Sequence, residues 1–491
     1  MLLLCVIALA VIVVDWFLPL KHSAYTGVVA LLCLAAAACF EVVFFFHGGP
    51  EAASRAMGEP VSILGDRLVL DSLGLFFTLF FTVTAFCTVL VSLRAHALRY
   101  RRLGEYYALL MLATVAMSVV IASRDFLVLY VAIETISLPC YVLAGYRRQE
   151  RIATEAALKY ILYGAVASGA MLFGISYVYG LTGTTIISSI YNLPVEKTAG
   201  LASGLILILA GLGFKAVFVP FHSWCPDVYE GAPTPITAYL SVASKAAGLA
   251  ALLRILLPLF CASETGWTIP DAIRRIDPWT IFWVLSAATM TFGNLVAIWQ
   301  TNVKRLLAYS SIAHAGYMAM AFSLMNKESF EAVIAYLVVY LVMNLGAFFT
   351  VLFIENATGK VSLDSYGGLV RRSPLLTVVL TIFLLSLLGI PPTAGFMAKF
   401  KMFGALIKAA SRPAIILAIV GIVNSVISAY YYLKVVKVMI FDSGEEETPI
   451  ATSLIDGTVL VVFAIAVFAL FVFWTPVQEL SNVFSLNLSK F

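Results

Sequence analysis

The chain has 491 residues, of which 62% are hydrophobic and 12% are charged, whereas an average soluble domain is roughly 45–50% apolar and about 25% charged. A soluble fold of this length would leave much of that apolar surface in water. The composition therefore excludes a soluble enzyme, a disordered chain and a disulfide scaffold, and a net charge of +4 is too small to indicate a nucleic-acid partner.

Apolar runs of about 20 residues, long enough to cross a ~30 Å hydrocarbon layer, recur along the whole chain. They predict an all-α polytopic membrane protein with about 14 transmembrane helices. The first run has no basic residue before its apolar part, so we expect a retained helix and not a cleaved signal peptide. The runs cover residues 1–19, 24–46, 69–93, 106–122, 125–145, 155–180, 200–226, 233–257, 279–299, 303–325, 329–355, 374–408, 413–441 and 454–474.

The basic residues predict the orientation of the chain. If both termini lie outside, 15 of the 31 lysines and arginines fall on the cytoplasmic side, 10 fall on the other side and 6 fall within helices. Cytoplasmic loops carry an excess of lysine and arginine, so both termini are expected outside.

The chain also contains a faint internal repeat. The run at 155–180 opens with Glu155 and reaches Tyr160, and the run at 329–355 opens with Glu331 and reaches Tyr336 at the same spacing. Because each series holds five helices, an odd number, the second is expected to be inverted relative to the first. The resulting divisions are an N-terminal three-helix segment (1–103), two five-helix repeats (104–258 and 259–441) and a C-terminal helix (442–491).

One helix in each series is expected to be discontinuous. The seventh run carries Pro220 and Pro226, and the twelfth carries Pro391 and Pro392. A proline lacks a backbone donor and displaces the preceding carbonyl, so each helix should break and expose polar backbone. Such groups are tolerated only against protein or a wet cavity, and broken helices in inverted repeats are typical of ion-moving transporters.

Ionisable side chains near the middle of helices indicate the chemistry. Glu134, Lys215, Lys245 and Lys399 lie deep in apolar runs, and Lys159 lies about one turn into its helix. Burial disfavours a charged ammonium group and a nearby carboxylate restores it, so a switchable glutamate could hold and release a lysine proton. Arginine could not serve, because it always keeps its proton. The alternative is that these charges only neutralise one another or reach an interface.

Other polar residues in the same segments have open roles. His222 and His314 could relay protons or form core hydrogen bonds, and Lys304 could be a relay or an interfacial anchor. Pro139 could let Glu134 swing or could produce a static kink. Arg254 and Lys401, nearer helix ends, are expected to extend toward the interface.

Motifs for other chemistry are absent from the sequence. No GxGxxG pattern follows a strand, and Gly359-Lys360 lacks the earlier glycine of a phosphate loop. The seven cysteines are scattered without a CxxC pair, so no metal site is predicted. Without a nucleotide-binding motif, the energy for any pumping would have to come from a source other than nucleotide hydrolysis by this chain.

Three segments resemble a known family. They are GFKAVFVPFHSWCPDVYEGAPTPITAYLSVASKAAG, NVKRLLAYSSIAHAGYM and LSLLGIPPTAGFMAKF. They resemble antiporter-like subunit N of proton-pumping NADH-quinone oxidoreductase, respiratory complex I, over most of residues 94–432. Sister subunits and multi-subunit cation/proton antiporters share the fold but usually carry a histidine where this chain has Val228-Tyr229-Glu230.

The resemblance implies roles for individual residues. It assigns Glu134, Lys215, Lys245 and Lys399 to proton translocation, and Lys159 and Lys304 to the polar row that links them. It also implies half-channels driven by quinone reduction in other subunits, with uptake from the cytoplasmic side. NADH, FMN, iron–sulfur clusters and quinone would lie in partner subunits, and no cofactor would lie in this chain.

The expected partners are other membrane-arm subunits, including sister antiporter-like subunits, in a bilayer of an energy-transducing membrane such as a bacterial inner membrane. Two alternatives stay open. The chain could be a subunit of a sodium/proton antiporter, or a passive scaffold that carries no ions.

Overall fold

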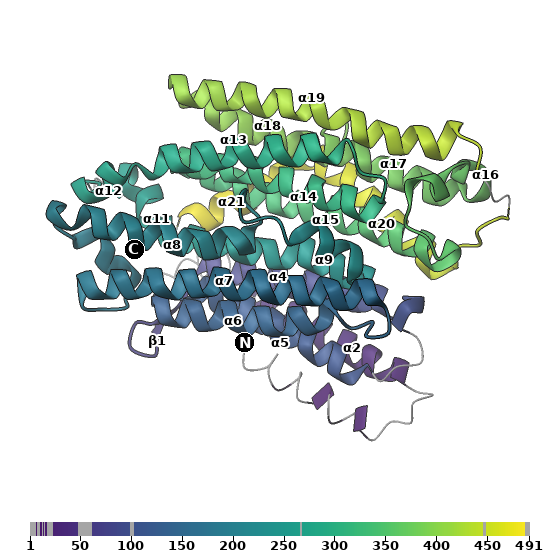
Figure 1. Ribbon diagram of the computed structural model, residues 1–491, viewed down its shortest axis with the longest axis horizontal. Coiled ribbons are helices and arrows are strands. Elements are labelled where there is room, and N and C mark those ends of the chain that lie inside the picture. The colour runs from purple at the N-terminus through teal and green to yellow at the C-terminus, as the bar shows by residue number, and fades with distance from the viewer. Residues whose placement is uncertain are drawn as a thin grey trace.

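A computed structural model describes residues 6, 10, 11, 13, 15 and 16 and residues 23–47, 61–98, 103–265, 268–444 and 448–486. The expected helix at 1–19 therefore falls largely outside the described residues. The long helices run along the horizontal of Figure 1, between α12 on the left and α16 on the right.

The N-terminal segment contains two described helices and one feature that the sequence did not predict. A short antiparallel hairpin pairs Val61 with Leu70. The elements are α2 (Ser23–His47), β1 (Val61–Ile63), β2 (Leu68–Leu70), α4 (Ser72–Ser92) and η2 (His96–Leu98).

The next group of helices carries most of the expected site residues. Its elements are α5 (Gly104–Ala122), α6 (Phe126–Ala144), α7 (Arg151–Thr182), η3 (Ile187–Asn192), η4 (Val195–Lys197), α8 (Thr198–Ala216), α9 (Cys225–Gly231), α10 (Thr234–Tyr239), the π-helix η5 (Leu240–Ser244) and α11 (Lys245–Thr265).

The remaining helices complete the bundle. They are α12 (Asp271–Ile276), α13 (Pro278–Ala297), α14 (Val303–Ala319), η6 (Met320–Ser323), α15 (Lys327–Thr358), η7 (Leu363–Tyr366), α16 (Leu369–Arg372), α17 (Pro374–Leu388), α18 (Ala394–Lys408), α19 (Arg412–Phe441), α20 (Leu454–Val472) and α21 (Trp474–Leu486).

Eleven helices in the described part of the chain are long and apolar enough to cross a membrane, and Pro374–Leu388 is a shorter apolar helix. The all-helical polytopic fold is therefore confirmed. The runs at 200–226 and 374–408 are each divided in two, as the prolines predict. The total number of spans and the inverted repeat stay predictions.

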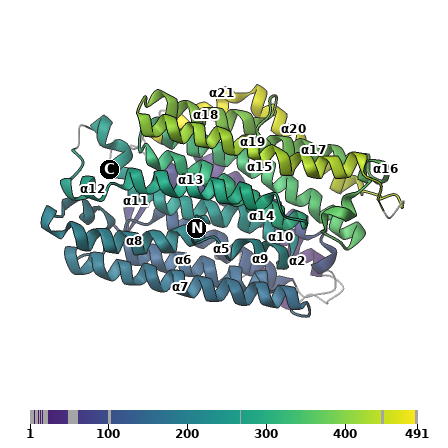
Figure 2. The ribbon, with the colours of Figure 1, turned by 45° about the horizontal axis from the view of Figure 1, so that its top comes forward.

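The core lies between two outer layers. The span Thr234–Phe260, made by α10, η5 and α11, is 100% buried, whereas only 28% of the α7 span is buried. Figure 1 places α19 along the upper long edge of the molecule, and Figure 2 places α7 along the lower long edge. The outer helices present apolar residues such as Val166 and Val426, as expected for surfaces that face lipid or partner helices.

The bundle has two ends, which we call the basic end and the far end. The basic end carries residues 93–98 and the connections at 145–150, 298–302 and 359–373, and Asn302 pairs with Ser362 there. The far end carries the loops at 123–125, 183–186, 324–326 and 409–411, and Asp125 pairs with Ile186 there. The charge distribution predicts that the basic end faces the cytoplasm.

Candidate functional site

The first helix break positions Lys215. α8 ends at Ala216 because Val217 adopts a left-handed conformation with φ +65°, which an α-helix cannot continue. The N–H of Phe218 donates back to the carbonyl of Gly213 over 2.8 Å. Lys215 therefore occupies the last turn of a half-helix that stops inside the bundle.

Polar groups of the surrounding protein satisfy the backbone that this break exposes. The N–H of Val219 donates to the Thr289 hydroxyl on α13 over 3.1 Å. The Trp224 ring nitrogen donates to the Phe214 carbonyl over 3.1 Å. Irregular backbone at membrane depth is stable under these conditions because protein groups replace the missing water.

The second break brings Lys399 to the end of another half-helix. α17 ends at Leu388, and Gly389 follows with φ +87°. A Cβ at Gly389 would lie 2.9 Å from Cδ of Lys399, so glycine is required here for both conformation and space. The Lys399 ammonium donates to the Leu388 carbonyl over 2.8 Å, at the negative end of the α17 dipole.

Lys245 lies at a change of helix type. The π-helix η5 ends at Ser244, and α11 begins at Lys245. Single π-helical turns inside longer helices recur at functional sites. Gly248, one turn later, allows α11 to approach the end of α8, because a Cβ there would lie 2.7 Å from the backbone nitrogen of Ala216.

Lys215 contacts a hydroxyl and not a carboxylate. Its ammonium donates to Ser137 Oγ over 3.0 Å and lies 6.0 Å from the Tyr160 ring centre. Ser137 is three residues after Glu134 on α6, so both side chains share a helix face. Glu134 is partly exposed. Glu134 and Lys215 therefore lie in one neighbourhood without a direct ion pair in this conformation.

Lys245 is bound by the middle of α14. Its ammonium donates to both the carbonyl and the hydroxyl of Ser311, and it lies 3.4 Å from the Tyr340 hydroxyl on α15. The Ser311 and Tyr340 hydroxyls are themselves 2.8 Å apart. Three helices thus meet at one buried ammonium group.

His314 continues the polar connection from Ser311 toward Lys399. Its Nδ1 is 2.7 Å from the Tyr336 hydroxyl, and its Nε2 is 3.4 Å from the Tyr432 hydroxyl. Tyr432 in turn lies 2.5 Å from Ser310 Oγ. The side chains that contact this histidine are therefore hydroxyl groups on two other helices, α15 and α19.

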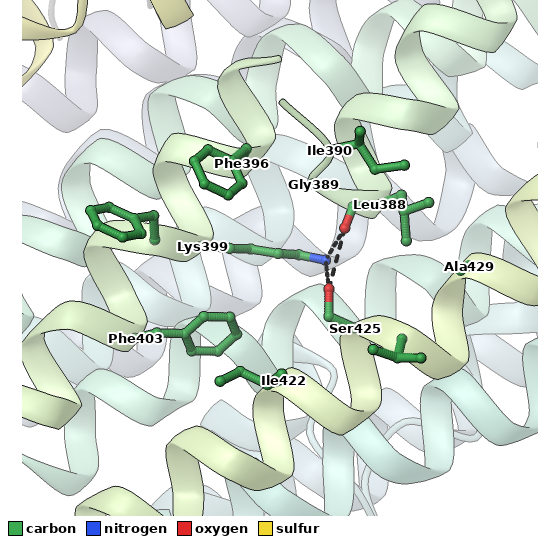
Figure 3. Close-up of a pocket in the computed structure, with 11 residues that line it drawn as sticks. Leu388, Gly389, Ile390, Phe396, Lys399, Phe403, Ile422, Ser425 and Ala429 are labelled. Carbon is green, nitrogen blue, oxygen red and sulfur yellow. Dashed lines mark hydrogen bonds between the residues drawn. The ribbon is translucent and has the colours of Figure 1, made fainter. Parts of the chain in front are cut away.

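Lys399 lines a pocket. A cavity of about 400 Å³ is lined mainly by apolar residues of α17, α18 and α19, and Figure 3 shows the ammonium group reaching across it to Leu388 and Ser425. The bond to Ser425 Oγ is 2.9 Å, and the Tyr317 ring centre lies 4.7 Å away. Because Phe400 and Val426 beside it are 62% and 69% exposed, the pocket is on the flank of the chain.

We call Glu134, Lys215, Lys245, His314 and Lys399, with the hydroxyls between them, the lysine row. Lys215, Lys245 and Lys399 are 1%, 1% and 4% exposed, and His314 is 1% exposed. These side chains are enclosed by protein and do not extend to an interface. Within the described residues, none of the three lysines has a carboxylate oxygen within 4.0 Å.

Three other expected relay residues lie apart from the row. Lys159 is 38% exposed and pairs with Glu155 and Asp227, each at 2.7 Å. Lys304 is fully buried near the basic end and donates to the Ala232 carbonyl over 2.7 Å. His222 packs against Phe292, and no hydrogen bond in the described part of the chain joins it to the row.

A charged cluster at the basic end was not predicted. Asp227 bridges Lys159 and Arg305, at 2.7 and 2.6 Å, and Arg305 also pairs with Glu230 at 2.8 Å. These four residues are named the basic-end cluster. The PDVYEG segment that carries the two acids is visible in the sequence, but only folding brings α7, α9 and α14 together.

The expectation for Arg254 is wrong. Its guanidinium is buried and pairs with Asp71 at 2.6 Å, and it also donates to the Ile121 carbonyl over 2.6 Å. Asp71 caps α4 by accepting from Gly74 N. The partner lies 183 residues away in the sequence, so helix position alone could not reveal it. Lys401 is also paired within the protein, to Glu331 at 3.7 Å.

Sequence reasoning missed the hydroxyl groups that connect the row. Ser137 and Ser425 are isolated polar residues on apolar helices, a weak signal in one sequence. Tyr336 stands out in the sequence only as a marker of the repeat. In the described part of the chain, no group of three histidine, cysteine or acidic side chains is arranged to hold a metal ion.

Comparisons with known proteins identify the family of the chain. Residues 123–428 match the family described as NADH:quinone oxidoreductase/Mrp antiporter, TM. The chain is 40% identical over 437 residues to NADH-quinone oxidoreductase subunit N of Anaeromyxobacter sp. (strain Fw109-5), covering 84% of each protein.

Two solved structures have the same fold. A chain of respiratory complex I from Thermus thermophilus is matched with a TM-score of 0.78 and 31% identity, over 97% of this chain and 98% of that one. A chain of the Mrp complex from Dietzia sp. DQ12-45-1b is matched with a TM-score of 0.82 over 99% and 97%, and at 20% identity it supports the fold alone. This chain therefore belongs to the NADH-quinone oxidoreductase subunit N family of membrane proteins.

Proposed function

We propose that this chain translocates protons through the lysine row as a membrane-arm subunit of an NADH:quinone oxidoreductase. The observation that carries the proposal is the set of buried lysines bound to hydroxyl and carbonyl oxygens instead of carboxylates. Burial without an opposite charge favours a neutral amine over an ammonium group. A lysine in that setting can lose and regain a proton when a nearby acid or water molecule changes position.

The helix breaks explain how such a row can be reached. Each break leaves backbone groups inside the bundle that water or a side chain can bind. Lys215 lies in the last turn of α8, and the Lys399 ammonium group lies at the end of α17. Lys245 lies beside Ser311. A proton taken up near Glu134 and Lys215 would pass through Lys245 and His314 toward Lys399. Uptake is proposed from the basic end and release at the far end.

The chemistry that drives transport is proposed to lie elsewhere. NADH, FMN, iron–sulfur clusters and quinone would be bound by partner subunits, and this chain would hold no redox or nucleotide site. The chain would lie in an energy-transducing membrane such as a bacterial inner membrane, with both termini outside. The positive charge at the basic end supports that orientation.

Replacement of Lys215 tests the proposal. In the assembled complex, Lys215→Ala should lower proton pumping and coupled quinone reduction, while NADH oxidation by an artificial acceptor stays normal because the redox subunits are untouched. Lys437→Ala, which alters a 69% exposed lysine paired with Asp442, is the matched control. Full pumping by Lys215→Ala would contradict the proposal.

Two alternatives give different results in the same preparation. A sodium/proton antiporter subunit would purify without flavin or iron–sulfur proteins and would move sodium against protons. A passive scaffold would leave proton flux intact after loss of both Glu134 and Lys215.

A further inference from the structure

An ion pair at the far end is not part of the lysine row. Glu331, in the second turn of α15, lies 3.7 Å from Lys401 of α18, and their side chains are 13% and 16% exposed. Lys401 also donates to Ser481 Oγ of α21 over 2.9 Å. Asn482 of α21 lies beside the same carboxylate, with an amide nitrogen that can donate to it over 2.8 Å. Three helices therefore converge on one partly buried carboxylate, Glu331.

The far-end pair, Glu331 and Lys401, lies on two helices, α15 and α18, that also carry residues of the row or in contact with it. Tyr336, which contacts His314 at 2.7 Å, is five residues after Glu331 on the same helix. A rise of 1.5 Å per residue separates their backbones by about 7.5 Å along α15. Lys401 is two residues after Lys399 on α18. Residues two or five positions apart on a helix do not share a face, so a proton passing from His314 or Lys399 to the Glu331 carboxylate would cross through water and not through a direct side-chain contact.

A second pair on the same two helices shows what distinguishes Glu331. Glu328 and Lys408 lie 3.1 Å apart, but their side chains are 50% and 71% exposed. Such a surface pair is screened by water and contributes little. Glu331 lies deeper along α15, between that surface pair and the row, and the α21 side chains seen beside the pair in the described residues, Ser481 and Asn482, are neutral.

Opposite ends of the molecule carry related arrangements. Glu155 near the start of α7 pairs with Lys159 at the basic end. Glu331, at the equivalent position of the second series, pairs with Lys401 at the far end. The two series thus place a glutamate–lysine pair at each end of the row, one on the proposed uptake side and one on the proposed release side.

From this placement we propose that Glu331 is the proton acceptor through which the row releases protons at the far end. The inference rests on the proposed function. A proton leaving His314 or Lys399 passes through water to a carboxylate oxygen of Glu331, and the neutral acid no longer attracts the Lys401 ammonium group. The acid then gives the proton to bulk water at the far end, and the ion pair forms again. Glu328 and Lys408 are the nearest other charged pair on α15 and α18.

Glu331→Gln in the assembled complex is the main test. Glutamine keeps the size of the side chain and its hydrogen bonds to Lys401 and α21, but it cannot take a proton. Coupled proton pumping should fall at least roughly tenfold, because removal of a positioned proton-transfer group costs about 10²–10⁴ in rate. Glu328→Gln is the matched control and should pump normally. Normal pumping by Glu331→Gln would overturn the inference.

Two further variants distinguish proton release from a purely structural role of the far-end pair. Ser481→Ala removes a contact between Lys401 and α21 but leaves the carboxylate. It should pump normally, whereas a loss equal to that of Glu331→Gln would show that the pair merely docks α21. Lys215→Ala is measured in parallel. If Lys215→Ala loses pumping and Glu331→Gln does not, the release site is wrong and the proposed function stands; if neither loses pumping, the proposed function itself fails.

Discussion

The lysine row and the basic-end cluster hold their charges in opposite ways. In the cluster, Lys159 and Arg305 each lie within 3 Å of carboxylate oxygens and stay in contact with the surface. In the row, Lys215 and Lys245 are 1% exposed and are bound by hydroxyl and carbonyl groups. A paired cation keeps its proton, whereas a buried and uncompensated one holds it weakly. We therefore assign the proposed transport to the row and charge balance to the cluster.

Replacing a lysine by methionine should have very different effects in the row and in the cluster. Lys245→Met removes the ammonium group that joins α11 to Ser311 and Tyr340, so pumping should fall at least roughly tenfold. Lys159→Met removes one arm of a surface cluster in which Asp227 keeps Arg305, and the loss should be far smaller. Proton pumping in proteoliposomes measures both. If both variants lost pumping equally, burial and charge pairing would not explain a difference in function between the row and the cluster.

The next prediction concerns the stability that the buried ion pair of Arg254 and Asp71 provides. Their side chains are 3% and 6% exposed, and removing one partner of a buried pair costs about 3–5 kcal/mol. Arg254→Met should therefore lower the thermal unfolding temperature of the purified complex. Asp71→Asn added to Arg254→Met should recover part of the loss, because asparagine keeps the α4 cap without a stranded charge. A double variant as unstable as the sum of both single changes would argue against direct pairing.

A glycine at the second break tests the placement of Lys399. Gly389→Ala must strain a residue at φ +87° and place a methyl group 2.9 Å from Lys399 Cδ, which costs about 1–3 kcal/mol. Pumping should decrease because the ammonium group is displaced from Leu388 and Ser425. Gly359→Ala is the control, since Gly359 has φ +68° and nothing within 4 Å of its Cβ position. Equal effects of the two changes would assign the loss to backbone strain alone.

The smallest expected effect is that of a single hydroxyl. Tyr336→Phe removes the group that contacts His314 Nδ1 at 2.7 Å, a contact worth about 1 kcal/mol. Pumping should fall by a few-fold, with assembly unchanged. Tyr366→Phe, a buried tyrosine whose hydroxyl has no partner within the described residues, should leave pumping unchanged. A Tyr336→Phe complex indistinguishable from Tyr366→Phe would remove the tyrosine from the path.

Periodicity and composition predicted much of the fold. The helical membrane architecture and the two breaks at Pro220 and Pro391 follow from local rules on apolar length and proline geometry, which a single sequence displays directly. The left-handed residue Val217 and the π-helix before Lys245 do not, because both depend on packing against distant helices. The unpredicted hairpin at 61–70 consists of two three-residue strands, which are too short to stand out in a search for apolar runs of about 20 residues.

The sequence predicted the charged residues of the candidate site but not the residues that they contact. An intramembrane lysine is conspicuous in a sequence because its cost is high and its position is local. Its partner is not conspicuous, as the pairs Arg254–Asp71 and Lys215–Ser137 show, since the residues are 183 and 78 positions apart. Burying a serine or tyrosine hydroxyl costs less free energy than burying a charge. Such residues therefore do not stand out in the sequence.

Replacing Lys245 by arginine tests most directly whether the row must titrate. Arginine preserves the positive charge and the hydrogen-bond donors but does not release its proton in proteins. The proton-to-electron ratio of the purified complex in proteoliposomes should fall in Lys245→Arg, with assembly and flavin content unchanged, and Lys159→Arg should keep the normal ratio. A Lys245→Arg complex that pumps at the normal ratio would show that a fixed charge is sufficient and would contradict proton transfer through the buried lysines.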